Sequence, residues 1–147
     1  MSDTRTPETD TSGRAIAALL EQAGHTVVGR RILRDEPAGV TALLRELLEL
    51  DDVQAIVSTG GTGISRRDST YEAVAGLFEK ELPGFGELFR MLSFQEIGPA
   101  AMLSRATAGL GAGRIIVLLP GSEHAVRLGM ERLVLPELGH LVSEARR

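Results

Sequence analysis

Two short apolar runs, each followed at once by glycine and polar residues, most constrain how this 147-residue chain can fold. The run "VQAIVS" occupies 53–58, and the run "RIIVLLP" occupies 114–120. Their length and composition are typical of buried strands, and longer patterns of helical spacing lie around them. Strands that alternate with helices predict an α/β fold, in which a mostly parallel central sheet is covered by helices on both faces.

The helical patterns are amphipathic, and several have clear end signals. The pattern over 11–24 ends at a glycine, and the pattern over 37–50 opens with a proline suited to a first helical turn. Further helices are predicted over 70–82, 84–98 and 122–147, the last as one helix or two. The stretch "HTVVGRRIL" over 25–33 is predicted to be another strand.

The first helical pattern has no strand before it, although a doubly wound sheet normally begins with one. Only three residues precede the polar stretch over 4–10. We therefore expect that a first strand is missing from the start of this sequence; the alternative is a sheet shorter than usual. No repeat or linker divides the chain, so a single domain is expected over 1–147.

Composition excludes several classes of function. The chain has no cysteine, so disulfides and thiolate metal sites are excluded. No apolar run approaches the roughly 18 residues needed to span a bilayer, and we expect a cytoplasmic protein without a membrane partner. A net charge of -4 argues against a nucleic-acid partner. Lys80 is the only lysine, so the basic groups are nearly all arginine, the planar phosphate ligand.

Polar residues follow each predicted strand, where the carboxyl ends of parallel strands meet at one edge of a sheet. "RDEP" with Asp35 follows the first, "TGGTG" over 59–63 the second, and "PGS" over 120–122 the third. A missing strand ending at Ser2 and Asp3 would join them. The sequence therefore predicts a ligand pocket at this edge.

The glycine-rich loop over 59–63 is suited to an anion. Its three glycines allow backbone angles closed to other residues and let amide groups point at a phosphate, while two threonines add hydroxyl donors. The spacing is neither that of a nucleotide P-loop nor that of a dinucleotide fingerprint. A tight turn that needs glycine for geometry alone is the alternative. Arg66 and Arg67 in the same loop favour the phosphate site.

Two carboxylates, Asp35 and Asp68, lie in predicted strand-to-helix connections. Helix capping is the ordinary role of aspartate at such positions. If both face the pocket, they could instead hold a Mg²⁺ ion that bridges polyphosphate oxygens. His124 lies near the predicted edge without an evident partner. No nucleophile stands out, because Ser104 and Ser122 lack a recognisable histidine partner and cysteine is absent. This favours phosphoryl or nucleotidyl transfer between two bound substrates.

Several segments, in order along the chain, resemble the MogA/MoaB family of molybdopterin adenylyltransferases. They are "SDTRT", "TDTSG", "TGGTGISRRDST", "ELPGFGELFR", "EIGPAAMLSRA" and "LPGS", with "DE" after the first predicted strand. The resemblance runs from residue 2 to about 140. It implies a single three-layer α/β domain, assembled as a trimer or hexamer, that joins AMP from Mg-ATP to molybdopterin and releases pyrophosphate. A downstream molybdate insertase, which receives the product, is an implied partner.

The resemblance also implies roles for particular residues. Asp35 and Asp68 match the family's two essential aspartates, with catalytic roles linked to Mg²⁺. The residues implied to bind substrate or phosphate are Thr59, Gly60, Gly61, Thr62, Gly63, Ser12, Ser104, Gly121 and Ser122. Asp3 and Arg105 lie in family motifs without an assigned contact. The pair Glu123 and His124 departs from the family, which has proline soon after this turn, and places an acid at the lip of the pocket.

Three functions compete on this basis. The first is an active adenylyltransferase. The second is a non-catalytic member that binds molybdopterin or assembles without turnover. The third is insertion of molybdate, which in relatives normally needs further domains that 147 residues would not hold.

Overall fold

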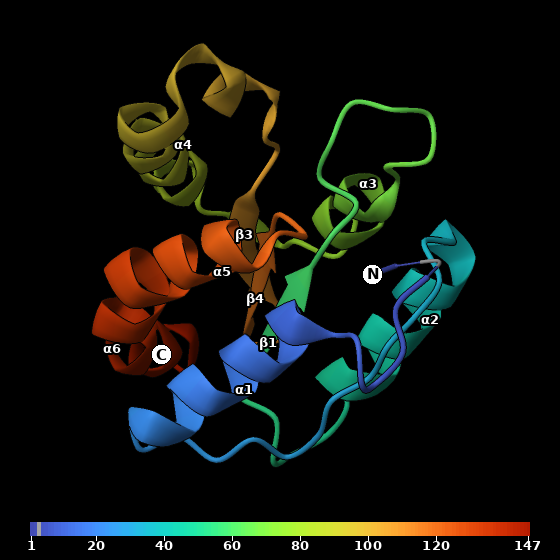
Figure 1. Cartoon of the computed structure of the whole chain (residues 1–147). Helices are drawn as coiled ribbons and strands as arrows, with labels where there is room; N and C mark the ends of the chain where they lie inside the picture. Colours follow the sequence, from blue (N-terminus) through green and yellow to red (C-terminus); the bar gives the residue numbers. More distant parts are fainter. Residues whose placement is uncertain (3) are drawn as a thin grey trace.

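The computed structural model describes residues 1–2 and 4–147 (Figure 1). Its elements are α1 (Thr11–Gln22), α2 (Pro37–Leu48), β1 (Ala55–Thr59), α3 (Thr70–Ala75), β2 (Lys80–Glu81), α4 (Pro83–Ile97), the 3₁₀ helix η1 (Gly98–Leu103), β3 (Thr107–Gly111), β4 (Arg114–Leu119), α5 (Glu123–Gly129), the π-helical turn η2 (Met130–Val134) and α6 (Leu135–Ala145). The predicted helices over 11–24, 37–50 and 84–98 are confirmed to within two residues at each end.

The central sheet has the strand order β1-β4-β3-β2. β1 pairs with β4 in parallel, from Ala55 opposite Ile115 to Thr59 opposite Leu119. β3 runs antiparallel to both β4 and β2. The α/β class is therefore confirmed, but the sheet is mixed, and the expectation that most pairings are parallel was wrong.

A two-residue hairpin explains the antiparallel pair. Ala112 and Gly113 connect β3 to β4, with φ angles of 49° and 71°. Positive φ at both central residues is the geometry whose twist matches that of two antiparallel strands. β3 itself reads "TAGLG", a run with two glycines and little apolar character, and the sequence therefore did not predict a strand there.

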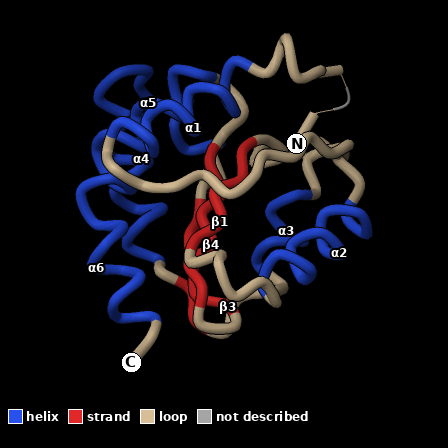
Figure 2. The backbone as a smooth tube through the Cα atoms, turned by 90° about the horizontal axis from the view of Figure 1, so that it is seen from below, coloured by secondary structure: helices blue, strands red, loops and turns tan. Residues whose placement is uncertain are grey.

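Helices cover both faces of the sheet (Figure 2). α1, α4, α5 and α6 lie on one side, and α2 and α3 lie on the other. A hydrophobic core lies on each face of the sheet, and β4 contributes to both because its side chains alternate between the faces. Ile115, Val117 and Leu119 pack with the first group of helices, while Ile116 and Leu118 pack with the second. None of the helices in the described ranges is both long and apolar enough to cross a membrane.

The helix predicted over 70–82 was wrong in its second half, because α3 ends at Ala75. The chain then pairs with β3: Glu79 N donates to Leu110 O at 2.7 Å, and Leu82 N donates to Ala108 O at 2.8 Å. Gly109 in β3 makes room for this segment, since a Cβ there would lie 2.6 Å from the Phe78 ring. Pairing with a strand distant in sequence therefore overrides the local helical pattern.

The strand predicted over 25–33 was also wrong, because this stretch runs as an irregular connection between α1 and α2 (Figure 2). A strand needs a neighbour that takes its hydrogen bonds. Among the described residues, no strand pairs with β1 on the edge away from β4. Ser2 N donates to Leu33 O at 2.9 Å, and the Met1 amino group donates to Thr59 O, so the start of the chain lies between these two segments. A first strand upstream stays a prediction.

Phe89 offers a test of the larger core, because it is the most voluminous of the fully buried side chains, with 1 % of its surface exposed. We expect Phe89→Ala to lower the free energy of unfolding by about 3–5 kcal/mol, since it removes apolar contacts and leaves a cavity. Urea denaturation followed by circular dichroism measures the loss. Phe89→Leu keeps part of the side-chain volume and should lower the free energy of unfolding by a clearly smaller amount. Equal losses for the two variants would contradict this packing.

Candidate functional site

The loops that follow β1 and β4 meet at one edge of the sheet. Gly60 N donates to Leu119 O at 2.9 Å, and Thr59 Oγ1 donates to Pro120 O at 2.7 Å. A Cβ on Gly121 would lie 3.5 Å from the Cα of Gly60. The structure thus places the glycine-rich loop and the turn over 120–122 side by side, which follows from the parallel pairing of the two strands.

The first two glycines of the loop are required by geometry. Gly60 and Gly61 have φ angles of +96° and +66°, which favour glycine. A Cβ on Gly60 would collide with the carbonyl oxygen of Met1, and one on Gly61 would collide with the hydroxyl of Thr70. Turn geometry is therefore enough to explain these glycines, and a phosphate site needs support from the side chains around them.

Asp35 lies against this loop. Thr70, which is fully buried, donates from Oγ1 to Asp35 Oδ1 at 2.6 Å. A Cβ on Gly61 would lie 2.9 Å from the same carboxylate oxygen. The N-cap of α2 is Glu36, without a side-chain capping bond.

Asp68 lies against the same loop from its other end. Its Oδ2 accepts hydrogen bonds from Ser65 N at 3.0 Å and from Ser65 Oγ at 2.6 Å. A Cβ on Gly63 would lie 2.6 Å from this oxygen. The N-cap of α3 is Ser69, so Asp68 does not cap that helix. Asp35 and Asp68 thus approach glycines only two positions apart, on one side of the molecule.

Both aspartates suit a divalent cation. The Ser65 hydroxyl, followed by backbone N–H groups and Arg105, holds the pKa of Asp68 below its usual value against a smaller opposing effect of burial. Asp68 is therefore ionised at neutral pH. No group of three or more His, Cys, Asp or Glu side chains forms a metal cage in the described ranges. Mg²⁺ commonly uses one or two carboxylates together with water and substrate phosphates, so these two residues fit it.

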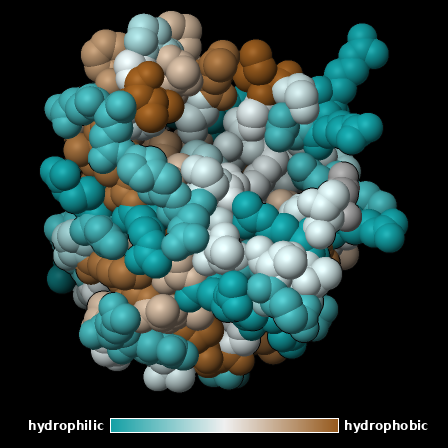
Figure 3. Space-filling view, viewed as in Figure 1, coloured by the Kyte–Doolittle hydropathy of each residue, from teal (hydrophilic) through white to brown (hydrophobic). Residues whose placement is uncertain are grey.

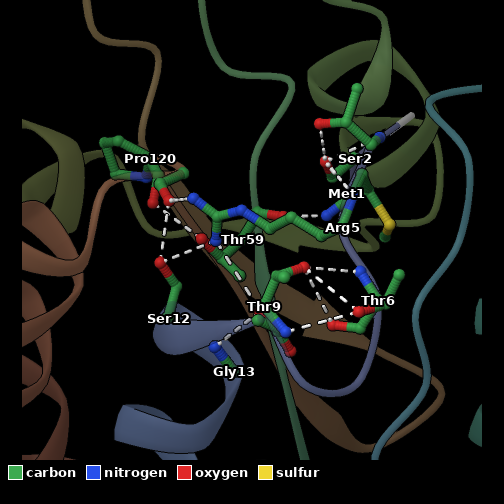
Figure 4. Close-up of polar contacts among 12 residues, drawn as sticks. Met1, Ser2, Arg5, Thr6, Thr9, Ser12, Gly13, Thr59 and Pro120 are labelled. Carbon is green, nitrogen blue, oxygen red and sulfur yellow. Dashed lines mark hydrogen bonds and ion pairs between the residues drawn. The ribbon is translucent and has the colours of Figure 1, made fainter.

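Ser12 holds the turn over 120–122 (Figure 4). It is fully buried, and its Oγ donates to Gly121 O at 2.8 Å. Arg5 spans the same contact: Nη1 donates to Ser12 Oγ at 2.9 Å, and Nη2 donates to Gly121 O at 2.9 Å. The Ser12 hydroxyl therefore holds the backbone of the turn. Asp3 lies outside the described residues.

Ser122 and the residues after it are engaged along α5. The Ser122 hydroxyl accepts a hydrogen bond from Ala125 N at 3.2 Å and caps the helix. Glu123 pairs with Arg127 at 3.0 Å, one helical turn away, and His124 contacts Glu96. Glu123, the acid predicted to lie at the lip of the pocket, therefore has an ion-pair partner on its own helix.

Arg105 lies beside the glycine-rich loop, although the sequence did not assign it a contact. Arg105 lies just before β3 in the chain. Because β3 is antiparallel to β4, β3 begins at the edge of the sheet where β1 and β4 end. The backbone N of Arg105 donates to Thr62 O at 3.1 Å, so the glycine-rich loop and the residues before β3 are joined directly. The sequence could not predict this contact because it did not predict β3. Arg5 and Thr70 were also part of quoted motifs, and the sequence predicted no partner for either.

Two cavities flank Arg105. One, of about 370 Å³, lies between α3 and α4, and Tyr71, Arg90, Ser104 and Arg105 are among its lining residues. The other, of about 400 Å³, is lined by Ile64, Ser65, Arg66, Asp68, Ser69, Glu72 and Arg105. Among the predicted site residues, Ser104 thus lines the first cavity and Asp68 lines the second.

Comparison with known proteins identifies the relatives of this chain. The family profile described as "Probable molybdopterin binding domain" matches residues 1–140. Molybdenum cofactor biosynthesis protein B of Halalkalibacterium halodurans is 52% identical over 98% of this chain and 85% of its own length. The Bacillus subtilis protein of the same name is 50% identical over 100% of this chain and 87% of its own length.

Solved structures of proteins named for the synthesis of molybdenum or tungsten cofactors have the same fold as this chain. A crystal structure of molybdenum cofactor biosynthesis protein B has a TM-score of 0.96 and 48% identity, over 99% of this chain and 91% of its own. The tungsten cofactor synthesizing protein MoaB from Pyrococcus furiosus has a TM-score of 0.84 and 42% identity, over 94% of this chain and 86% of its own.

The contact between Ser65 and Asp68 generates a pH-dependent prediction. Ser65→Ala removes the largest cause of the lowered pKa, so the Asp68 pKa should rise toward its usual value. The contribution of Asp68 to stability is present above its unfolded pKa and is lost as pH falls through the lowered folded value; Ser65→Ala should move this loss to higher pH. Carboxyl ¹³C NMR titration measures the shift. Ser69→Ala is the control, and an unchanged Asp68 pKa in Ser65→Ala would contradict the assignment.

Proposed function

Because the chain belongs to the family of probable molybdopterin-binding domains, we propose that it takes part in molybdenum cofactor biosynthesis as a molybdopterin adenylyltransferase. In this reaction AMP passes from Mg-ATP to the terminal phosphate of molybdopterin, and pyrophosphate is released. Its relatives are named for molybdenum cofactor biosynthesis, which supports the pathway. The cytoplasm stays the predicted compartment.

The observation that carries this proposal is the approach of Asp35 and Asp68 to the same glycine-rich loop. Asp68 and Arg66 line one cavity, so a carboxylate and a guanidinium face the same space. Carboxylates hold a hard cation, and arginine binds phosphate oxygens through a planar pair of donors. This combination is suited to a polyphosphate substrate that arrives with Mg²⁺.

The chemistry is a displacement at phosphorus. A phosphate oxygen of molybdopterin forms a bond to the α-phosphorus of ATP, and the bond from that phosphorus to the pyrophosphate oxygen breaks. Asp35 and Asp68 would hold Mg²⁺, which when bound neutralises charge on the leaving pyrophosphate. The glycine-rich loop orients the phosphates, and Ser12 and Arg5 keep the Gly121 turn beside it. Positioning and charge neutralisation are the main sources of rate in such transfers.

A non-catalytic binding member of the same family is the alternative. It would bind molybdopterin without consuming ATP. Release of pyrophosphate from Mg-ATP, dependent on added molybdopterin, separates the two functions, and its absence in the purified protein would favour the alternative.

Asp68→Asn tests the proposed reaction. Removing one charge-stabilising group should lower turnover about 100- to 1,000-fold, because the amide holds a cation poorly. Molybdopterin binding and the circular dichroism spectrum should change little, since Asp68 lies in a surface loop. Pyrophosphate release measures turnover, and Asp52→Asn, an exposed aspartate in the turn before β1, is the matched control. Normal turnover by Asp68→Asn would refute the assignment.

We further propose that the chain assembles as a homo-oligomer, a trimer or hexamer, through α4 and η1. Large apolar side chains are exposed there, and Figure 3 shows hydrophobic surface at the top of the molecule, where η1 lies in Figure 1. They are Leu88, Met91, Phe94, Ile97, Met102 and Leu103, each between 47% and 74% exposed. Contiguous apolar patches of this kind are typical of protein–protein interfaces. The product would then pass to a downstream molybdate insertase.

The double variant Met91→Ser, Phe94→Ser tests this interface. Both side chains are more than half exposed, so the fold should be retained while the oligomer dissociates to smaller species. Sedimentation velocity measures the change. Leu50→Ser, which alters an exposed leucine after α2, should leave the oligomer intact. An unchanged sedimentation coefficient for the double variant would exclude this face as the interface.

A further inference from the structure

Arg105 holds both ends of the loop that carries Asp68. Its Nε donates to Thr62 O at 3.3 Å, and its Nη2 donates to Asp68 O at 2.8 Å. The guanidinium also lies over the Tyr71 ring, 4.8 Å from the ring centre. An arginine presents five N–H donors in a fixed plane. These contacts therefore fix the direction of the remaining donor group, Nη1, relative to the loop.

Nη1 contacts the carboxylate of Glu72. Both residues line the cavity of about 400 Å³ that also contains Asp68 and Arg66. The Glu72 side chain is 60% exposed, whereas that of Arg105 is 27% exposed. Ion pairs exposed to this degree contribute little net free energy, so another anion can replace the carboxylate at low cost.

Glu72 is also close to a second negative charge. The hydrogen bond from Arg105, the largest influence, lowers the Glu72 pKa, and the charge of the Asp68 carboxylate, the smallest influence, opposes this. Loss of the contact with Arg105 would leave the two carboxylates facing the same cavity. Glu72 therefore has a reason to turn out into solvent once another anion takes its place.

We propose that Glu72 occupies, in the free protein, the place on Arg105 that a phosphate group of the polyphosphate substrate takes when it binds. Arg105 is then a positioning residue for the loop through Nε and Nη2 and a phosphate ligand through Nη1. Glu72 acts as a built-in competitor that sets the affinity of the cavity for anions. This inference rests on the proposed function only in assuming that polyphosphate enters the cavity.

Titration of the full chain with magnesium pyrophosphate by calorimetry tests the proposal. Glu72→Gln removes the competing charge and should bind pyrophosphate about two- to fivefold more tightly than the wild type. Glu131→Gln makes the same change of charge at a glutamate that pairs with Arg127 on α5, and it should bind as the wild type does.

Arg105→Lys tests the positioning role, because lysine keeps the charge but lacks the fork of donors. It should bind pyrophosphate more weakly, and the amides of 62–68 should exchange hydrogen faster than in the wild type. Arg114→Lys is the matched control, since Arg114 also donates to two backbone carbonyls, those of Ala112 and Leu50, far from the cavity. It should leave both measurements unchanged.

Tighter binding by Glu72→Gln together with weaker binding by Arg105→Lys supports the proposal. Equal or weaker binding by Glu72→Gln, unchanged binding by Arg105→Lys, or no binding of pyrophosphate by any form overturns it. Adenylyl transfer is measured separately as AMP joined to molybdopterin. Lack of transfer with the expected binding pattern would refute the proposed function alone, and transfer without that pattern would refute this inference alone.

Discussion

The parallel pairing of β1 with β4 is the interaction on which the rest of the site depends. The register places Thr59 opposite Leu119, and the first residue after β1, Gly60, continues the ladder with a hydrogen bond to Leu119 O. Two loops distant in sequence therefore leave the sheet at the same level and the same edge. A slip of one residue would turn the side chains of β4 to the opposite cores and separate the loops.

Several side chains around this edge donate hydrogen bonds to the backbone of its loops. Thr59, Ser12 and Arg5 donate to carbonyls of Pro120 and Gly121, and Arg105 donates to the carbonyls of Thr62 and Asp68. A loop with three glycines loses much conformational entropy when it becomes ordered. These contacts offset part of that cost before a ligand arrives, which is the usual requirement for a precise binding site.

The same arrangement gives different surroundings to two aspartates that look alike in sequence. Asp35 is half-buried and tied to the buried Thr70, whereas Asp68 lies in a loop, with its carboxylate held by Ser65 and its carbonyl by Arg105. Asp35 is thus fixed by the core, whereas Asp68 is held by contacts with Ser65 and Arg105. A cation shared by both would tie the loop to the core.

Local sequence determined much of this protein: the buried strands β1 and β4, the main helices, the glycines of the turn and the two aspartates beside them. These features depend on apolar periodicity and on backbone angles, which neighbouring residues set. Tertiary structure alone decided the mixed sheet, the strand β3, the early end of α3 and the irregular path over 25–33. It also decided that Ser12 holds a turn and that Arg105 reaches the loop. Each of these depends on a hydrogen-bond partner that is distant in the chain, and local pattern carries no information about which distant segment supplies it.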